Sequence, residues 1–113
     1  MAVSSFISIN YPIYPRPEYV NAVAMATATA ENIPVPAGAT HVLISGSGNF
    51  LVNFFGTASS PGDTTDGTAS FYCATQKEYW FSLEPRTDGT PIANISVIPV
   101  TSATVTAAFY KKN

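Results

Sequence analysis

The chain has 113 residues, of which 46% are hydrophobic and only 11% are charged, and its formal net charge is −2. This length fits one domain, which can fold around its own core without disulfides or metal. The five Lys and Arg residues form no large basic cluster, which argues against nucleic-acid binding, since that needs several cations on one face. Cys73 is the only cysteine, so an intrachain disulfide is excluded.

The sequence predicts neither a signal peptide nor a membrane helix. No apolar run approaches the roughly 18 residues of a membrane helix. The first nine residues lack the positively charged start and the long apolar core of a signal peptide. We therefore expect no membrane partner and synthesis in a cytoplasm.

The low charge content has two interpretations. Ordinary soluble domains carry about 25% charged residues. A surface with fewer charges often lies against a partner protein, but a neutral β surface rich in Thr, Ser and Ala has the same composition.

Residues 1–19 predict an extended N-terminal arm. Pro12, Pro15 and Pro17 forbid a helix and hold the backbone extended. Side chains this apolar and aromatic should not remain in water, so the arm lies either on a partner protein or along the edge of its own sheet. The candidate partner-binding residues of the arm are Phe6, Ile7, Ile9, Tyr11, Ile13, Tyr14, Arg16 and Tyr19.

Residues 20–113 predict a β-sandwich domain made of short strands. Residues 20–31 alternate with period two, which favours one strand although the segment is rich in alanine. Residues 33–36 contain two prolines and predict an irregular edge segment. Gly46 to Asn49 predicts a hairpin turn, and residues 56–67 predict a polar surface loop. The other predicted strands are 41–45, 50–55, 70–73, 78–83, 92–100 and 103–110.

Seven or eight short strands with turn signals between them, and no competing long helix, are typical of an all-β fold. We therefore expect a single antiparallel β-sandwich, jelly-roll-like, with the N-terminal arm extending from it.

No set of residues predicts a catalytic, metal or cofactor site. His41 is the only histidine and has no nucleophile or acid near it in sequence, so we expect a strand-edge histidine with a satisfied ring. One histidine and one cysteine cannot build a typical zinc site. Asp63, Asp66 and Asp88 offer oxygens to calcium but lack EF-hand spacing, and turns capped by aspartate are the simpler account.

Four aromatic residues suggest a possible binding platform. Tyr72, Tyr79, Trp80 and Phe81 could stack on a sugar, but Trp80 points to the opposite side of its strand from its two neighbours. Packing of at least two of the four into the core is the competing expectation. An exposed Trp80 would fit carbohydrate binding or a subunit interface.

Several segments together resemble small virion proteins of tailed bacteriophages. The resemblance rests on Ile33 to Ala39, on the strand-turn-strand segment from His41 to Gly56, on Asp66-Gly-Thr68 and on the final segment ending at Tyr110. It covers about residues 20–111, it is a pattern of strands and turns without a diagnostic motif, and the nearest type is the capsid decoration, or cement, protein.

The resemblance implies a jelly-roll-like domain that binds the outside of an assembled capsid, between subunits of the major capsid protein, as a dimer or trimer. It implies location on the virion, no catalytic residues and no cofactor. Two other hypotheses stand beside it: a carbohydrate- or protein-binding module of a phage tail, neck or fibre, and a small enzyme, which the lack of a catalytic set makes the weakest.

Overall fold

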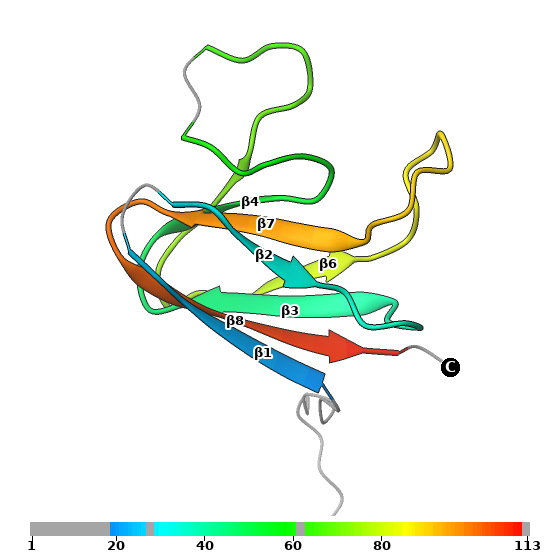
Figure 1. Cartoon of the computed structure of the whole chain (residues 1–113), viewed down its shortest axis with the longest axis horizontal. Coiled ribbons are helices and arrows are strands. Elements are labelled where there is room, and N and C mark those ends of the chain that lie inside the picture. The colour runs from blue at the N-terminus through cyan, green and yellow to red at the C-terminus, as the bar shows by residue number, and fades with distance from the viewer. Residues whose placement is uncertain (1–18, 27–28, 61–62, 112–113) are drawn as a thin grey trace, which may run out of the picture.

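The computed structural model describes residues 19–26, 29–60 and 63–111. In this part of the chain, eight strands and no helix form two antiparallel four-stranded sheets that pack face to face (Figure 1). The prediction of an all-β sandwich is confirmed.

The two sheets have the strand order of a jelly roll. Sheet A has the order β1-β8-β3-β6 and sheet B the order β2-β7-β4-β5. Only β4 and β5 follow one another in the chain within one sheet, so every other connection crosses between sheets. The strands are β1 (Tyr19–Met25), β2 (Glu31–Pro34), β3 (His41–Gly46), β4 (Phe50–Asn53), β5 (Phe71–Cys73), β6 (Tyr79–Ser82), β7 (Asn94–Pro99) and β8 (Ala103–Tyr110).

The predicted strand over residues 20–31 is two strands in different sheets. β1 ends at the buried Met25, and β2 begins at Glu31 in sheet B. A run of alternating Ala and Thr keeps its period of two without a turn signal, which is why the crossing was not visible in the sequence. β2 extends into the segment predicted to be irregular, and its Pro34 is tolerated because β2 is an edge strand.

The predicted hairpin at Gly46 to Asn49 is wrong, because this turn carries the chain from sheet A to sheet B. Ser47 fastens it to β8: its N–H donates to the Thr104 carbonyl at 3.0 Å, and its Oγ accepts from the Thr104 N–H at 2.9 Å. A Cβ on Gly48 would lie 2.6 Å from the Ser102 carbonyl oxygen, so the crossing needs glycine for close approach. A Gly-Ser-Gly turn marks a change of direction but not which sheet receives the chain.

The core lies between the sheets and is built by alternate residues of each strand. Phe50 is fully buried and lies opposite Pro99 and Cys73 on the two neighbouring strands of sheet B. In β4, β6 and β8 the residues that face the core stand at alternate positions: Phe50 and Val52, Tyr79 and Phe81, and Val105, Ala107 and Phe109. The largest fully buried side chains are Phe50, Ile33, Ile44, Ile95, Val42, Val52, Val97, Val105 and Cys73.

The long β4–β5 connection covers part of the outer face of sheet B. Its described residues in 56–67 are exposed, as predicted, except Ala58, whose N–H donates to the buried Ser96 Oγ at 2.8 Å.

Near the far end of the β4–β5 connection, the Thr68 hydroxyl and N–H donate to Asp66 Oδ1 at 2.6 and 3.1 Å, and these bonds lower the pKa of Asp66. Asp88 likewise accepts from the Thr90 N–H at 3.0 Å. The prediction of aspartate-capped turns is confirmed at both positions.

Candidate functional site

The outer face of sheet A is the most extended uncharged surface that the strand register defines. Val20 of β1, Ala108 of β8, Leu43 of β3 and Trp80 of β6 lie opposite one another in a continuous apolar row across all four strands. Val20 is 51% exposed and Trp80 is 43% exposed, so the two ends of the row stand open in the described structure. The inner faces of the same strands fill the core.

No outward-facing residue of the described strands of sheet A is Asp, Glu, Lys or Arg. The register and the alternation of exposed and buried positions define this outer face. Its members are Val20, Ala22, Ala24, His41, Leu43, Ser45, Trp80, Ser82, Thr104, Thr106, Ala108 and Tyr110. A face of this kind resembles the centre of a protein interface, which is depleted in charge and enriched in aromatic residues.

Trp80 has an aromatic neighbour that its own sequence context does not contain. The rings of Trp80 and Tyr110 lie with centroids 4.9 Å apart and planes at 45°. They come from β6 and β8, which lie on either side of β3. The pair therefore forms an aromatic surface at one end of the apolar row.

His41 lies beside this aromatic pair, opposite Tyr110 and Ser82 on the neighbouring strands. Its Nδ1 is 2.9 Å from Thr40 Oγ1, so one ring nitrogen has a hydrogen-bond partner, as expected for a satisfied strand-edge histidine. The Ser82 hydroxyl accepts from the Glu84 N–H at 3.2 Å. Thr40 is therefore the hydroxyl partner of His41, and Ser82 uses its own hydroxyl to hold the backbone of Glu84.

The predicted four-residue aromatic platform does not form. Tyr79 and Phe81 are partly buried and pack against the core, where Phe81 also contacts Phe54 at 4.8 Å between ring centroids. Tyr72 is 53% exposed but belongs to β5 of the other sheet, so it lies far from the Trp80 face in the topology. The competing expectation, that at least two of the four belong to the core, is confirmed.

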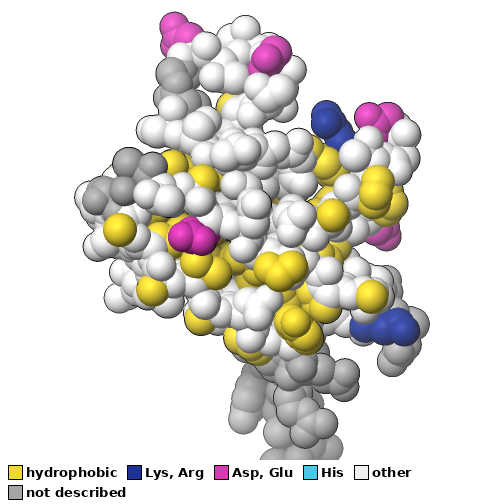
Figure 2. All heavy atoms as spheres, in the orientation of Figure 1, with side chains coloured by type: hydrophobic (Ala, Val, Ile, Leu, Met, Phe, Trp, Pro, Cys, Tyr) yellow, Lys and Arg dark blue, Asp and Glu magenta, His cyan; other side chains and the backbone are white. Residues whose placement is uncertain are grey.

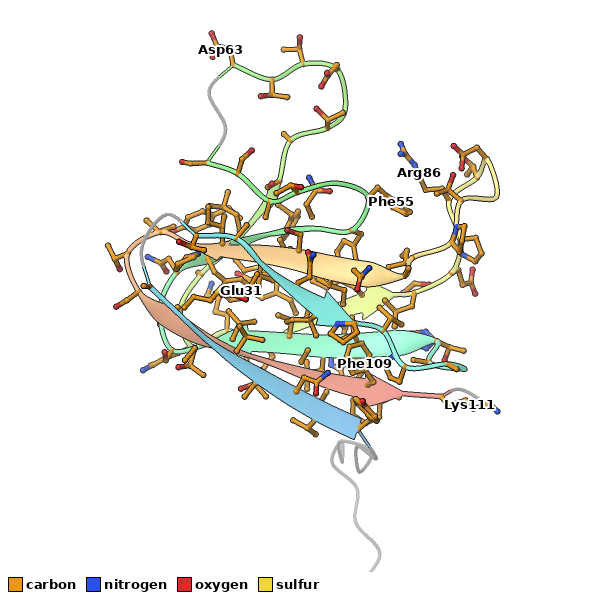
Figure 3. All side chains as sticks on the ribbon, in the orientation of Figure 1. Glu31, Phe55, Asp63, Arg86, Phe109 and Lys111 are labelled. Atoms are coloured by element: carbon orange, nitrogen blue, oxygen red, sulfur yellow. The ribbon has the colours of Figure 1, made fainter. Side chains whose placement is uncertain are left out.

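A second surface feature lies under the loops at the β4–β5 and β6–β7 connections. The Arg86 guanidinium carbon is 4.8 Å from the centroid of the Phe55 ring, a cation–π contact between two exposed side chains (Figure 3). It borders a pocket of about 400 Å³ whose wall includes Val52, Phe71 and Thr68. No sequence signal links Arg86 to Phe55, because loop packing alone brings the two together.

Most of the predicted arm residues lie outside the described residues: Phe6, Ile7, Ile9, Tyr11, Ile13, Tyr14 and Arg16. Tyr19 is described, and it is the first residue of β1, with its ring edge-on to Phe109 at 6.1 Å between centroids. Tyr19 is 49% exposed at the rim of the sandwich, and its role in binding stays a prediction. Trp80 is exposed and outward-facing as predicted, while its role in binding stays a prediction.

Within residues 19–26, 29–60 and 63–111, no three His, Cys, Asp or Glu side chains come together as metal ligands. No helix of this part of the chain is long and apolar enough to cross a membrane. Cys73 is buried, and burial raises the pKa of its thiol to about 12.

No protein-family model, curated protein or solved structure matches this chain.

Proposed function

We propose that the chain is a structural virion protein of a tailed bacteriophage, which binds the outer surface of the capsid between subunits of the major capsid protein and stabilises the shell. The observation that carries the proposal is the uncharged outer face of sheet A, with its exposed Trp80 packed against the half-buried Tyr110. The sequence resemblance to decoration proteins supplies the identity of the partner. In this proposal the chain has no catalytic role and no cofactor.

The composition of the outer face supports protein binding. Trp and Tyr are the residues that most often dominate binding energy when they are buried at the centre of an interface. The flanking Leu43 and Ala108 are apolar, and the surrounding Ser and Thr side chains can exclude water without bringing a charge into the interface. A broad, open sheet face of this type suits a protein partner better than a small ligand, which needs a concave site.

Replacing Trp80 by alanine should weaken binding to capsids at least about 30-fold, which corresponds to ~2 kcal/mol for a central aromatic residue. The measurement is co-sedimentation with capsids of the encoding phage that were assembled without this chain. Tyr72→Ala is the matched control, because Tyr72 is also exposed but lies on sheet B. Equal binding by the wild-type chain and Trp80→Ala would remove this face from the proposal.

The N-terminal arm should supply a separate part of the contact. A chain that begins at Tyr19 keeps all of β1 and should still fold, but it should no longer bind the same capsids. The reason is that a segment strapped over neighbouring subunits adds buried area and links them. Thermal unfolding followed by circular dichroism checks the fold. Full binding by the shortened chain would contradict the role of the arm.

The second candidate function is a carbohydrate- or protein-binding module of a phage tail, neck or fibre. The Trp80–Tyr110 pair favours the carbohydrate form, since two aromatic rings on an open face can stack on a sugar. A glycan array screened with the wild-type chain and with Trp80→Ala separates the two candidates. Glycan binding that disappears in Trp80→Ala, with no binding to capsids, would favour the module.

A further inference from the structure

β1 is an edge strand with an open backbone. It pairs with β8 on one side only, and none of the other backbone hydrogen bonds of the described residues involves Tyr19 to Met25. In an antiparallel ladder, alternate residues direct their N–H and C=O groups away from the neighbouring strand. Within residues 19–26, 29–60 and 63–111, the outer edge of β1 therefore carries a row of backbone donors and acceptors without a backbone partner, which is a template for another strand.

The other three edges of the sandwich have features that protect them, and β1 does not. β2 has four residues and contains Glu31 and Pro34. β5 has three residues and β6 has four. β1 has seven residues, Tyr-Val-Asn-Ala-Val-Ala-Met, with neither a charge nor a proline. Natural sheets use short length, charge and proline to prevent edge pairing. Among the four edge strands, β1 alone has none of these features, which indicates that its edge can pair with another strand.

The side chains of β1 also allow a second strand to approach. Its outward-facing residues are Val20, Ala22 and Ala24, all small and exposed. Figure 2 shows hydrophobic side chains over the part of the molecule where β1 lies, while the visible charged side chains lie at the margins and beside β2. Glu31 is labelled beside β2 in Figure 3.

We propose that β1 pairs antiparallel with β1 of a second copy of this chain, across a twofold axis at Ala22. This register places Ala22 opposite Ala22 of the partner subunit and Tyr19 opposite Met25 of the partner subunit. This register uses all seven residues of β1. It also places inward-facing residues of one strand opposite inward-facing residues of the other, and outward-facing residues opposite outward-facing ones. The two copies of sheet A become one continuous eight-stranded sheet.

The strand that pairs with β1 comes from a second copy of this chain, because the edge of β1 is complementary to itself. A twofold axis brings every residue of β1 against β1 again, and an uncharged strand does so without placing like charges opposite one another. The pairing rests on the edge of sheet A and leaves its outer face free. It therefore does not depend on the proposed function, and capsid binding and dimer formation can fail separately.

Size-exclusion chromatography with light scattering on the full chain tests the proposal. The wild-type chain should elute at twice its 12.0 kDa chain mass. Ala22→Lys places two like charges opposite each other at the axis and should raise the dimer Kd roughly 100-fold or more. Ser82→Lys is the control, because Ser82 is exposed on β6 at the opposite edge of the same sheet and should leave the dimer unchanged.

Two further variants test the register. Ala22→Glu alone should also be monomeric, and an equimolar mixture with Ala22→Lys should recover the dimer. Ala22→Cys should form a disulfide between subunits on oxidation, because directly opposite Cα atoms lie about 4.5–5.5 Å apart. The wild-type chain should not, since Cys73 is buried.

A monomeric wild-type chain would overturn the proposal, as would a dimer that Ala22→Lys leaves intact or that Ser82→Lys dissociates. A mixture that stays monomeric would overturn the register. Far-UV circular dichroism checks that each variant is folded, and Ala24→Lys on the same outward side replaces Ala22→Lys if the latter does not fold.

Discussion

Truncating Phe50 to alanine should lower the free energy of unfolding by about 3–5 kcal/mol. Phe50 is fully buried between the sheets, where it faces Pro99 and Cys73 on the adjacent strands and covers Gly46 at the crossing into β4. Removing the ring loses its burial and also leaves a cavity, because the two sheets are held apart by the other core side chains. A loss of this size is a large part of the ~5–15 kcal/mol that stabilises a domain.

Urea denaturation followed by circular dichroism measures this loss. The matched control is Phe55→Ala, which removes the same atoms from a side chain that is 43% exposed. We expect the control to cost only about 1 kcal/mol, mainly through the lost contact with Arg86. Similar midpoints for the two variants would mean that Phe50 does not lie in the core.

The second large effect concerns the reactivity of Cys73. In the folded chain it should react with a thiol reagent such as Ellman's reagent at least about a thousandfold more slowly than in urea-unfolded chain at pH 8. Burial raises the pKa of the thiol from 9.0 to about 12, which lowers the fraction of reactive thiolate by about that factor. The fully buried side chain also excludes the reagent, so the labelling rate should follow unfolding.

An exposed cysteine in the same chain provides the control for this labelling. Ala69→Cys, in the exposed part of the β4–β5 connection, should add one fast-reacting thiol while Cys73 stays slow. Since the pKa of Cys73 is raised on folding, its protonated form stabilises the fold below about pH 9, and this contribution is lost as the pH rises from 9.0 toward 12. Rapid reaction of both thiols in the folded chain would contradict the burial of Cys73.

Local patterns in the sequence predict the strands better than they predict their partners. Alternation identifies the inward sides of β4, β6 and β8, because burial of one face leaves a period of two in the chain. The same rule cannot separate β1 from β2, since both are edge strands with short side chains between them. It also cannot show that Gly46 to Asn49 joins two sheets, because a turn specifies a bend and not its destination.

The features of the candidate site were also predicted only in part from the sequence. That Trp80 faces the opposite side of β6 from Tyr79 and Phe81 was predicted, and the packing of those two neighbours against the core makes Trp80 the outward residue. The contact between the Trp80 and Tyr110 rings was not predicted, because it depends on β3 lying between β6 and β8. The Arg86–Phe55 contact depends on two loops with no repeating pattern, and the sequence carries no signal for it.

The central position of β8 in sheet A has a consequence for how the protein is made. β8 lies between β1 and β3, although it is the last strand of the described residues and β1 is the first. During synthesis, β1 and β3 therefore lack the strand that lies between them until residues 103–110 have left the ribosome. Pairing between such distant segments makes folding slow, on the scale of milliseconds to seconds for β-sandwiches. We infer that the domain folds only once β8 has emerged rather than strand by strand, and that the edge of β1 is exposed to other chains throughout this interval.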